Sequence, residues 1–290
     1  MSNRRVGRLA LASLLVLPTA LVAAGAGPDE GTATGQLVVG GKQTALAHAY
    51  ARAHPDPFDK TKERTVVVLS DVSLPPEEFL EQFPGLKLAA KGKAHIVTVE
   101  LKGDGTVVSA SMLHDAFAAT DSFLGAGTPI FKAKAFDAKV VEGTLGTEKP
   151  VEFDKKKFEY KATFRAPVWR RPAPTATGAA AAQTAPGKAA LAFVKAATSG
   201  DKAATKKLLT RDAEAAKALD GPQAKDVLKM LGMVNPKPAV AKVENVWVLG
   251  NGAEVTISGK AADEATSHTL ILVLVGNEWL VDQEMSSPWF

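Results

Sequence analysis

Near the middle of this chain lies a segment with the periodicity of neither a helix nor a strand. Residues 170–188 read RRPAPTATGAAAAQTAPGK, and these small and polar side chains offer no apolar face to bury. The prolines also argue against a helix through the segment, because proline removes a backbone donor. Such a composition is typical of a flexible or semi-extended linker. It predicts one domain at residues 33–168, a linker at 169–187 and a second domain at 188–290.

The N-terminal segment predicts where the protein works. Three arginines at positions 4–8 precede an apolar run at 9–22, and small residues follow at 23–26. This order is the pattern of an export signal cleaved after Ala26 or, alternatively, after Ala24. The run is shorter than the roughly 20 apolar residues of a membrane-spanning helix, which favours a cleaved signal over a membrane anchor. No later segment is long and apolar enough to span a bilayer, so we expect no membrane span once the signal is removed. We predict a bacterial protein exported to the periplasm or the medium in soluble form.

Composition excludes several classes of function. The chain has no cysteine, which excludes disulfides, cysteine nucleophiles and thiolate metal sites. It has 35 basic and 31 acidic residues, but three of the basic ones lie in the export signal, so the net charge of the remainder is near +1. This balance gives no reason to expect nucleic acid as a partner.

The first half is predicted to be antiparallel β. Residues 158–166 alternate apolar and polar side chains, the pattern of a half-buried strand, and we expect Pro167 to end that strand. Further strands are expected at 37–39, 43–53, 64–69, 94–113 (a hairpin), 130–136 and 139–145, with a short helix at 76–82. This many short strands predicts a sandwich or a partly open barrel.

This half resembles a recurrent, uncharacterised β domain of secreted bacterial proteins. The resemblance lies in residues 46–51 (LAHAYA), 66–71 (VVVLSD) and the strand at 160–167. It implies one domain over 33–168 and carries no known chemistry.

The second half is predicted to be α+β. Helices are expected at 186–200, 201–209, 211–219 and 222–232, followed by strands at 246–249, 253–258, 270–275 and 278–282. Helices followed by an antiparallel meander resemble the cone-shaped nuclear-transport-factor-2-like superfamily, on residues 193–201 (FVKAATSGD), 207–209 (KLL) and 278–282 (EWLVD). That family contains enzymes, binding proteins and assembly domains. Its enzymes usually hold Asp, His or Tyr in the cone pocket, whereas this half has one histidine, His268, and no tyrosine, so the resemblance implies no catalytic role here.

Histidines of the first half form the candidate metal site. A zinc ion needs three or four converging ligands, and His48, His114 and Asp115 are the set we consider. The alternative is that these histidines are surface or hydrogen-bonded groups without a metal. A hydrolase built on Ser70, Asp71 and His114 is weaker, because nothing in the sequence marks Ser70 as an activated nucleophile.

Two tryptophans of the second half are candidate ligand-binding residues. Trp247 and Trp279 could line the mouth of a cone, although core packing in the meander is the alternative. No cofactor is expected, since no motif for one is present.

The strand from Leu270 to Val275 is apolar on both faces. An antiparallel strand with one wet face should alternate, so something must cover its second face. The first domain, a second copy of the chain or a foreign partner could do so. We predict a homodimer through this strand.

These observations favour a non-catalytic binding or accessory protein of the cell envelope. The alternatives are a small-ligand carrier that uses the C-terminal cone and an enzyme with a histidine-based site in the first domain.

Overall fold

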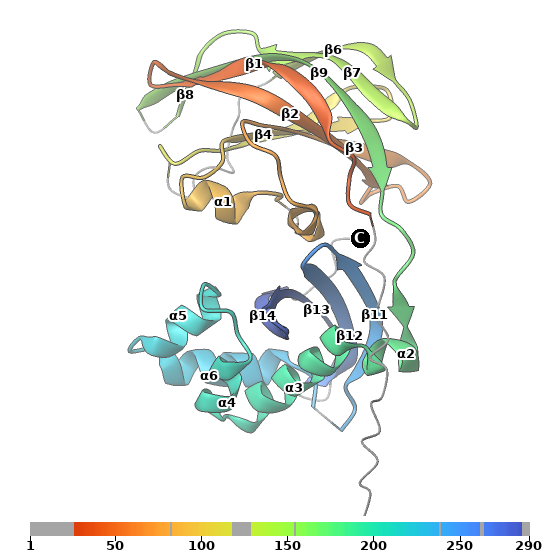
Figure 1. The fold of residues 1–290 in the computed structure, drawn as a ribbon, viewed down its shortest axis with the longest axis vertical. Coiled ribbons are helices and arrows are strands. Elements are labelled where there is room, and N and C mark those ends of the chain that lie inside the picture. Colours follow the sequence, from red (N-terminus) through yellow and green to blue (C-terminus); the bar gives the residue numbers. More distant parts are fainter. Residues whose placement is uncertain are drawn as a thin grey trace, which may run out of the picture.

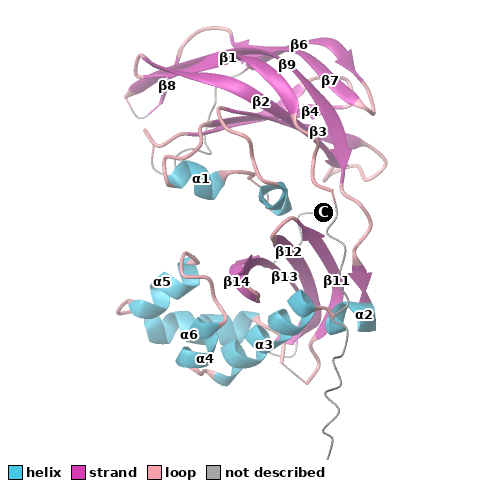
Figure 2. Cartoon of the chain, in the orientation of Figure 1, coloured by secondary structure: helices cyan, strands magenta, loops and turns pink. Residues whose placement is uncertain are grey.

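The computed structural model describes residues 26–81, 83–117, 129–153, 155–237, 239–261 and 264–285. The chain is mostly antiparallel β, arranged in two sheets with a few helices (Figures 1 and 2). The predicted export signal lies outside the described residues, apart from Ala26. Among the residues described, no helix is long and apolar enough to cross a bilayer.

The N-terminal sheet curls into a half-barrel. Its order is β5-β4-β3-β2-β1-β9-β7-β6, and β8 pairs with β9. The strands are β1 (Gly31–Val39), β2 (Lys42–Pro55), β3 (Glu63–Ser70), β4 (Ile96–Lys102), β5 (Val107–Leu113), β6 (Pro129–Phe136), β7 (Val140–Thr147), β8 (Val151–Phe153) and β9 (Lys156–Arg170). The predicted mostly antiparallel β structure is therefore confirmed for this half.

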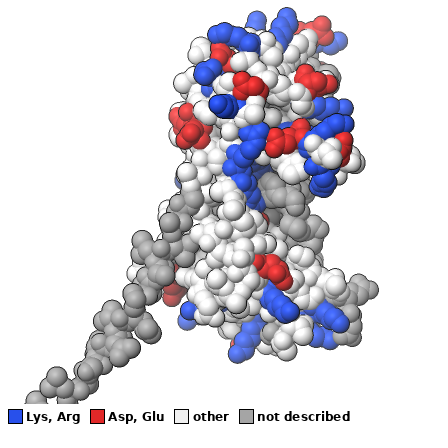
Figure 3. Space-filling model, turned by 90° about the vertical axis from the view of Figure 1, so that its right-hand side faces the viewer, with Lys and Arg blue, Asp and Glu red and all other residues white. Residues whose placement is uncertain are grey.

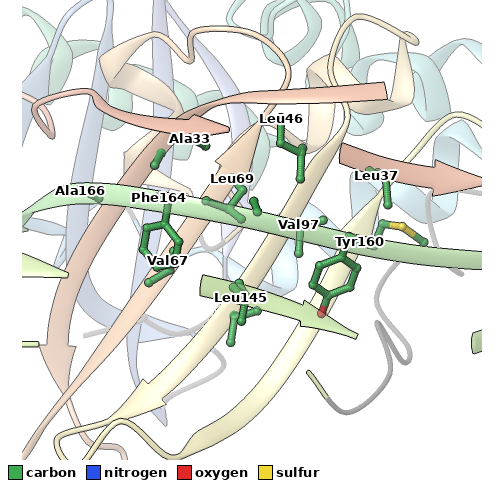
Figure 4. Packing of buried hydrophobic residues seen from close by; sticks show 14 of the residues in the cluster. Ala33, Leu37, Leu46, Val67, Leu69, Val97, Leu145, Tyr160, Phe164 and Ala166 are labelled. Carbon is green, nitrogen blue, oxygen red and sulfur yellow. The ribbon is translucent and has the colours of Figure 1, made fainter. Parts of the chain in front are cut away.

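Alternating side chains fill the concave side of the half-barrel. Val97 of β4 and Tyr160 and Phe164 of β9 point into the same core (Figure 4), and Val99 and Leu101 of β4 belong to that core as well. All five are at most 2% exposed, so the interior is a packed core. The period of two in the sequence produces this arrangement directly.

Pro167 does not end its strand, contrary to expectation. It pairs with Val140 of β7, and β9 continues to Arg170. The last residues of β9 change partner and run parallel to β2, where Ala51 faces Val168. Pro167 has no backbone N–H to donate, and it lies at the point where β9 changes from one neighbouring strand to another.

One connection covers the convex face of β2 to β5. Residues 71–95 carry η1 (Pro76–Leu80) and α1 (Leu86–Ala90) and lie beneath the sheet in Figure 1. Phe79 and Leu74 pack there against Tyr50, Val68 and Ile96 of the strands. The short helix expected at 76–82 is therefore present as a 3-10 turn, whereas α1 was not predicted.

The C-terminal sheet has the order β10-β11-β12-β13-β14. Its strands are β10 (Ala176–Thr177), β11 (Lys242–Leu249), β12 (Gly252–Ala261), β13 (Glu264–Val275) and β14 (Glu278–Met285). The helices are α2 (Gly178–Gln183), α3 (Ala185–Ser199), α4 (Lys202–Lys207), α5 (Glu214–Asp220) and α6 (Ala224–Val234). They cover one face of the sheet, where Phe193 and Leu219 pack on Val255 and Leu270.

The central segment is not the irregular linker that we expected. Residues 176–183 form β10, which pairs with β11, and α2. Pro172 and Pro174 precede these elements, and Pro186 lies in the first turn of α3, where proline is tolerated. The prolines mark the ends of elements and leave the alanine run between them free to form a helix. The division of the chain into two domains stays a prediction.

The doubly apolar strand has different neighbours on its two faces. Leu270 and Leu272 face the helices. Ile271 faces the N-terminal half, where it packs with Leu249 and with Leu80 of η1. The first half of the chain therefore supplies cover for part of the second face, while Val275 is 52% exposed. Dimerisation through this strand stays a prediction.

Candidate metal centre

Polar side chains gather at one edge of the half-barrel, where the ends of three adjacent strands lie side by side. The last residue of β3, the first of β4 and the last of β5 are paired in register. Neighbouring antiparallel strands run in opposite directions, so the residues just beyond these positions share one edge. Those residues are Asp71, His95 and His114, and Asp115 follows.

Three of these side chains converge on a common point. His95, His114 and Asp115 each offer a metal-ligating atom, and the three atoms lie within 4.8 Å of one another. Asp115 Oδ1 is 2.9 Å from His114 Nδ1 and 3.4 Å from His95 Nε2. The two imidazole rings are 4.3 Å apart between centroids.

Hydrogen bonds to neighbouring groups decide which ring nitrogens carry a hydrogen. His95 Nδ1 lies 2.6 Å from Asp71 Oδ2, and a carboxylate can only accept, so Nδ1 carries the proton. His114 Nδ1 accepts from the Ala116 backbone N–H at 2.9 Å and therefore has no proton. In the neutral rings, His95 Nε2 faces Asp115 with a lone pair, whereas the single lone pair of His114 Nδ1 accepts from the Ala116 N–H. A ring lone pair that faces a carboxylate oxygen needs a proton or a cation between the two atoms.

Burial keeps one ring neutral. His114 is 4% exposed, and burial together with the nearby His95 lowers its pKa to about 4. Its Nε2 has no hydrogen-bond partner among the described residues. The pKa of Asp115 is also lowered: burial acts upward, but the protonated form of His95, which donates from Nε2 and carries charge, and the charge of protonated His114 outweigh it. A neutral imidazole beside an ionised carboxylate suits a cation better than a second proton does.

The donor set fits a divalent transition metal. Two imidazole nitrogens and one carboxylate oxygen are the ligands of three-ligand zinc sites, which keep a further position open. The carboxylate of Asp71 behind His95 is the usual outer partner of a metal-bound histidine. Gly92 allows the chain to turn beside the cluster: its φ is +64°, and a Cβ there would lie 3.5 Å from Asp115 Oδ2.

The structure brings together two of the three predicted ligands. His114 and Asp115 are adjacent, but His48 is held elsewhere by Glu30, with 2.9 Å between Nδ1 and Oε1. His95 takes its place in the cluster and was not singled out from the sequence. The hairpin at 94–113 and the strand at 64–69 were both predicted, so the shared edge of these strands was the signal that could have found His95.

The alternative set for a hydrolase is not assembled. Ser70 is fully buried, and its hydroxyl accepts from the Val72 N–H at 3.3 Å. Asp71 is bonded to His95 and not to His114.

The two candidate tryptophans lie on opposite faces of the C-terminal sheet. Trp279 packs on the helix-covered side. Trp247 packs on the other side with Leu80, and the Arg171 guanidinium lies 3.9 Å from its ring centroid. They do not form one wall of a ligand site.

A second polar cluster lies under the helices of the C-terminal sheet. Asn235 donates to Glu284 Oε1 at 2.7 Å, and His268 Nδ1 lies 3.7 Å from the same oxygen. Burial raises the pKa of Glu284 to about 7, although the Asn235 hydrogen bond opposes the rise. Asn235 Oδ1 and His268 Nδ1 are buried without a well-formed hydrogen bond among the described residues, although the Val234 carbonyl lies near the ring.

The face of the molecule in Figure 3 carries no large patch of one charge, because basic and acidic side chains are interspersed there.

Comparison with known proteins places the chain in no family. No family model matches the sequence, and neither a curated protein nor a solved structure matches it.

Proposed function

We propose that the chain is an exported, non-catalytic binding protein of the cell envelope whose N-terminal sheet binds a divalent transition metal ion, with Zn²⁺ as the first choice. The ligands are His95 Nε2, His114 Nδ1 and Asp115. One observation carries the proposal: Asp115 Oδ1 lies 2.9 Å from His114 Nδ1 and 3.4 Å from His95 Nε2, and the three side chains each offer a ligating atom within 4.8 Å of the others. Ligand atoms about 2.0–2.2 Å from a zinc ion are separated by comparable distances in a tetrahedral site.

Binding is a better account of this cluster than acid–base catalysis. A general base needs a ring nitrogen that can take a proton from a substrate. His95 shares one nitrogen with Asp71 and turns the other to the cluster. His114 is almost fully buried, and its Nδ1 is already bonded to the Ala116 N–H. Both rings are thus held in place by the protein, and a metal ion binds His114 Nδ1 by replacing its hydrogen bond to the Ala116 N–H. Export rests on the sequence of residues 1–26.

The test is a zinc titration of the purified chain against a chromophoric chelator, with Co²⁺ and Ni²⁺ as further metals. We expect one bound ion per chain and a rise in thermal stability, about 2.7 kcal/mol at a free metal concentration 100 times Kd. His95→Gln should remove one of three ligands and Asp115→Asn should take the charge from another, so each should weaken binding by at least about 10–100-fold, the loss typical of removing an outer partner.

His48→Gln is the matched control, because His48 is a histidine of the same sheet that is bonded to Glu30 outside the cluster. It should bind zinc like the unaltered chain. Absence of binding, or equal losses in His48→Gln and His95→Gln, would overturn the proposal.

A second candidate is a small-ligand carrier that uses the C-terminal layer, as the resemblance to the cone-shaped superfamily implies. The buried cluster of Asn235, His268 and Glu284 favours it, because buried polar atoms without partners invite a bound molecule. A thermal-shift screen with small polar and apolar ligands tests this candidate. A hit that survives Asp115→Asn and is lost in Glu284→Gln would place the ligand in this layer. Hits that survive Glu284→Gln, or none at all, would count against it.

A further inference from the structure

Asp71 holds His95 at two points. Its Oδ1 accepts from the His95 backbone N–H at 2.7 Å, and its Oδ2 lies 2.6 Å from the ring Nδ1. Both side chains are mostly buried, with 17% and 13% of their surface exposed for Asp71 and His95. Because both donors belong to one residue, a single carboxylate fixes both the main chain and the rotation of the ring.

This contact also fixes where the ring carries its proton. A carboxylate accepts at both oxygens, so the neutral ring must keep its hydrogen on Nδ1 and leave Nε2 with a lone pair. That lone pair points at Asp115 Oδ1, 3.4 Å away. Without the Asp71 carboxylate, a free imidazole could place the hydrogen on either nitrogen, and a hydrogen on Nε2 would block the ligating atom.

Asp71 is itself held by contacts that involve no ligating atom of the cluster. Its own N–H donates to the His95 carbonyl at 3.3 Å. Two residues further on, the Ser73 hydroxyl bonds to Glu30, and the Leu74 N–H donates to the Tyr50 hydroxyl at 2.8 Å. The loop that carries the carboxylate is therefore anchored on both sides, and its position does not depend on a metal ion.

We propose that Asp71 is a positioning residue for the metal centre: it holds His95 in the Nδ1–H tautomer before metal arrives, so that Nε2 is ready to bind. This inference rests on the proposed metal-binding function. Loss of such an outer carboxylate typically weakens metal affinity by about 10–100-fold.

The test is Asp71→Asn, studied in the full chain. Asparagine has nearly the same shape and can present its oxygen to the His95 backbone N–H. Its amide N–H₂ must then face Nδ1, which favours the opposite tautomer. We expect ¹⁵N ring shifts to show Nδ1–H in the metal-free parent at a pH at which the ring is neutral, and Nε2–H in the variant. Zinc affinity should fall by about 10–100-fold.

Asp104→Asn is the matched control, since Asp104 lies in the β4–β5 turn at the far end of the same strands and bonds to the Thr106 N–H. It should change neither the His95 tautomer nor zinc affinity.

The outcomes separate this inference from the function on which it rests. A parent chain that binds no zinc overturns the proposed function, and the tautomer of metal-free His95 then decides the role of Asp71. Nε2–H in the parent, or unchanged zinc affinity in Asp71→Asn, overturns the positioning role. If Asp71→Asn does not fold, the tautomer of the parent still decides.

Discussion

The two sheets cover their second faces in different ways. The convex face of the N-terminal sheet is covered by residues 71–95, the connection between its own neighbouring strands β3 and β4. The outer face of the C-terminal sheet is covered around Ile271 by Leu80, which lies in that same connection. One segment therefore serves both sheets. The N-terminal sheet carries its cover within its own sequence, whereas the C-terminal sheet depends on a distant part of the chain.

This difference explains why one half could be predicted from the sequence more fully than the other. A cover inserted between adjacent strands is local, but the partner of Ile271 is a long-range contact. The apolar run at 270–275 indicates that a cover is needed, and nothing in the run says what supplies it. Substitutions at each cover measure how strongly the C-terminal sheet depends on it.

The largest effect is expected for Leu270→Lys compared with Ile271→Lys. Leu270 is fully buried under the helices, so a lysine there buries a charge without a partner and should cost more than about 4 kcal/mol. Ile271→Lys acts at the contact with Leu80 and should release the sheet from η1 while its helix-covered core remains.

Circular dichroism and thermal unfolding of the two variants check this pair. Loss of the C-terminal secondary structure is expected in Leu270→Lys alone. Equal damage in both variants would show that the two covers are equally necessary.

We expect the free energy of unfolding to depend on pH through Glu284, which lies on the helix-covered side of the C-terminal sheet. The folded pKa of Glu284 is about 7, raised by burial from an ordinary value near 4.5. The folded state therefore holds this proton where the unfolded state has lost it. The contribution to stability is full below about pH 4.5 and is lost as the pH rises toward 7, by about 2–3 kcal/mol at most.

Chemical unfolding between pH 4.5 and 8 tests this prediction with Glu284→Gln, which removes the titrating group and keeps its shape. The variant should show a flatter profile than the parent over this interval. Glu244→Gln, on the exposed side of β11, is the control and should leave the profile unchanged. An identical slope in Glu284→Gln and the parent would contradict the burial of this carboxyl.

Gly252→Val probes the docking of the two sheets. A Cβ at Gly252 would lie 2.6 Å from Glu77 Cβ and 3.0 Å from Leu80 Cδ1, so η1 must move away. Overpacking of this kind costs about 1–3 kcal/mol. We expect faster proteolysis at residues 170–187 and a change in tryptophan fluorescence, because Trp247 packs at this contact.

Gly221→Ala is the control for Gly252→Val, since a Cβ there comes no closer than 3.4 Å to the Ala218 carbonyl. If both variants resist proteolysis equally, the β11–β12 hairpin and η1 are not docked against each other in solution.

The sequence predicted what repeats locally and missed what depends on position. Alternation at 158–166 predicted β9, yet Pro167 was misjudged because its effect depends on which neighbour needs its N–H. The alanine run at 179–182 looked like a linker, because helix formation there depends on prolines falling at element ends. For the metal centre, His114 and Asp115 were found, and His95 required the register of β4 against β5.

The smallest effects should come from the ion pairs that join the two halves, and they should differ with burial. Lys87 of α1 bonds to Glu81 at 2.8 Å and to Asp282 of β14, and both carboxylates are less than 10% exposed. Lys91 pairs with Asp212 at 2.6 Å, but about half of each side chain is exposed.

Lys87→Met should cost about 1–2 kcal/mol because it leaves two buried carboxylates without this cation. Lys91→Met should cost less than about 0.5 kcal/mol, since water and salt screen an exposed pair. Urea unfolding of both variants at low and high salt measures the difference. If the two losses were equal, or if the loss in Lys87→Met vanished in high salt, α1 would contact the C-terminal sheet only through a solvated surface, and the dependence of that sheet on the N-terminal half would reduce to the apolar contact at Leu80.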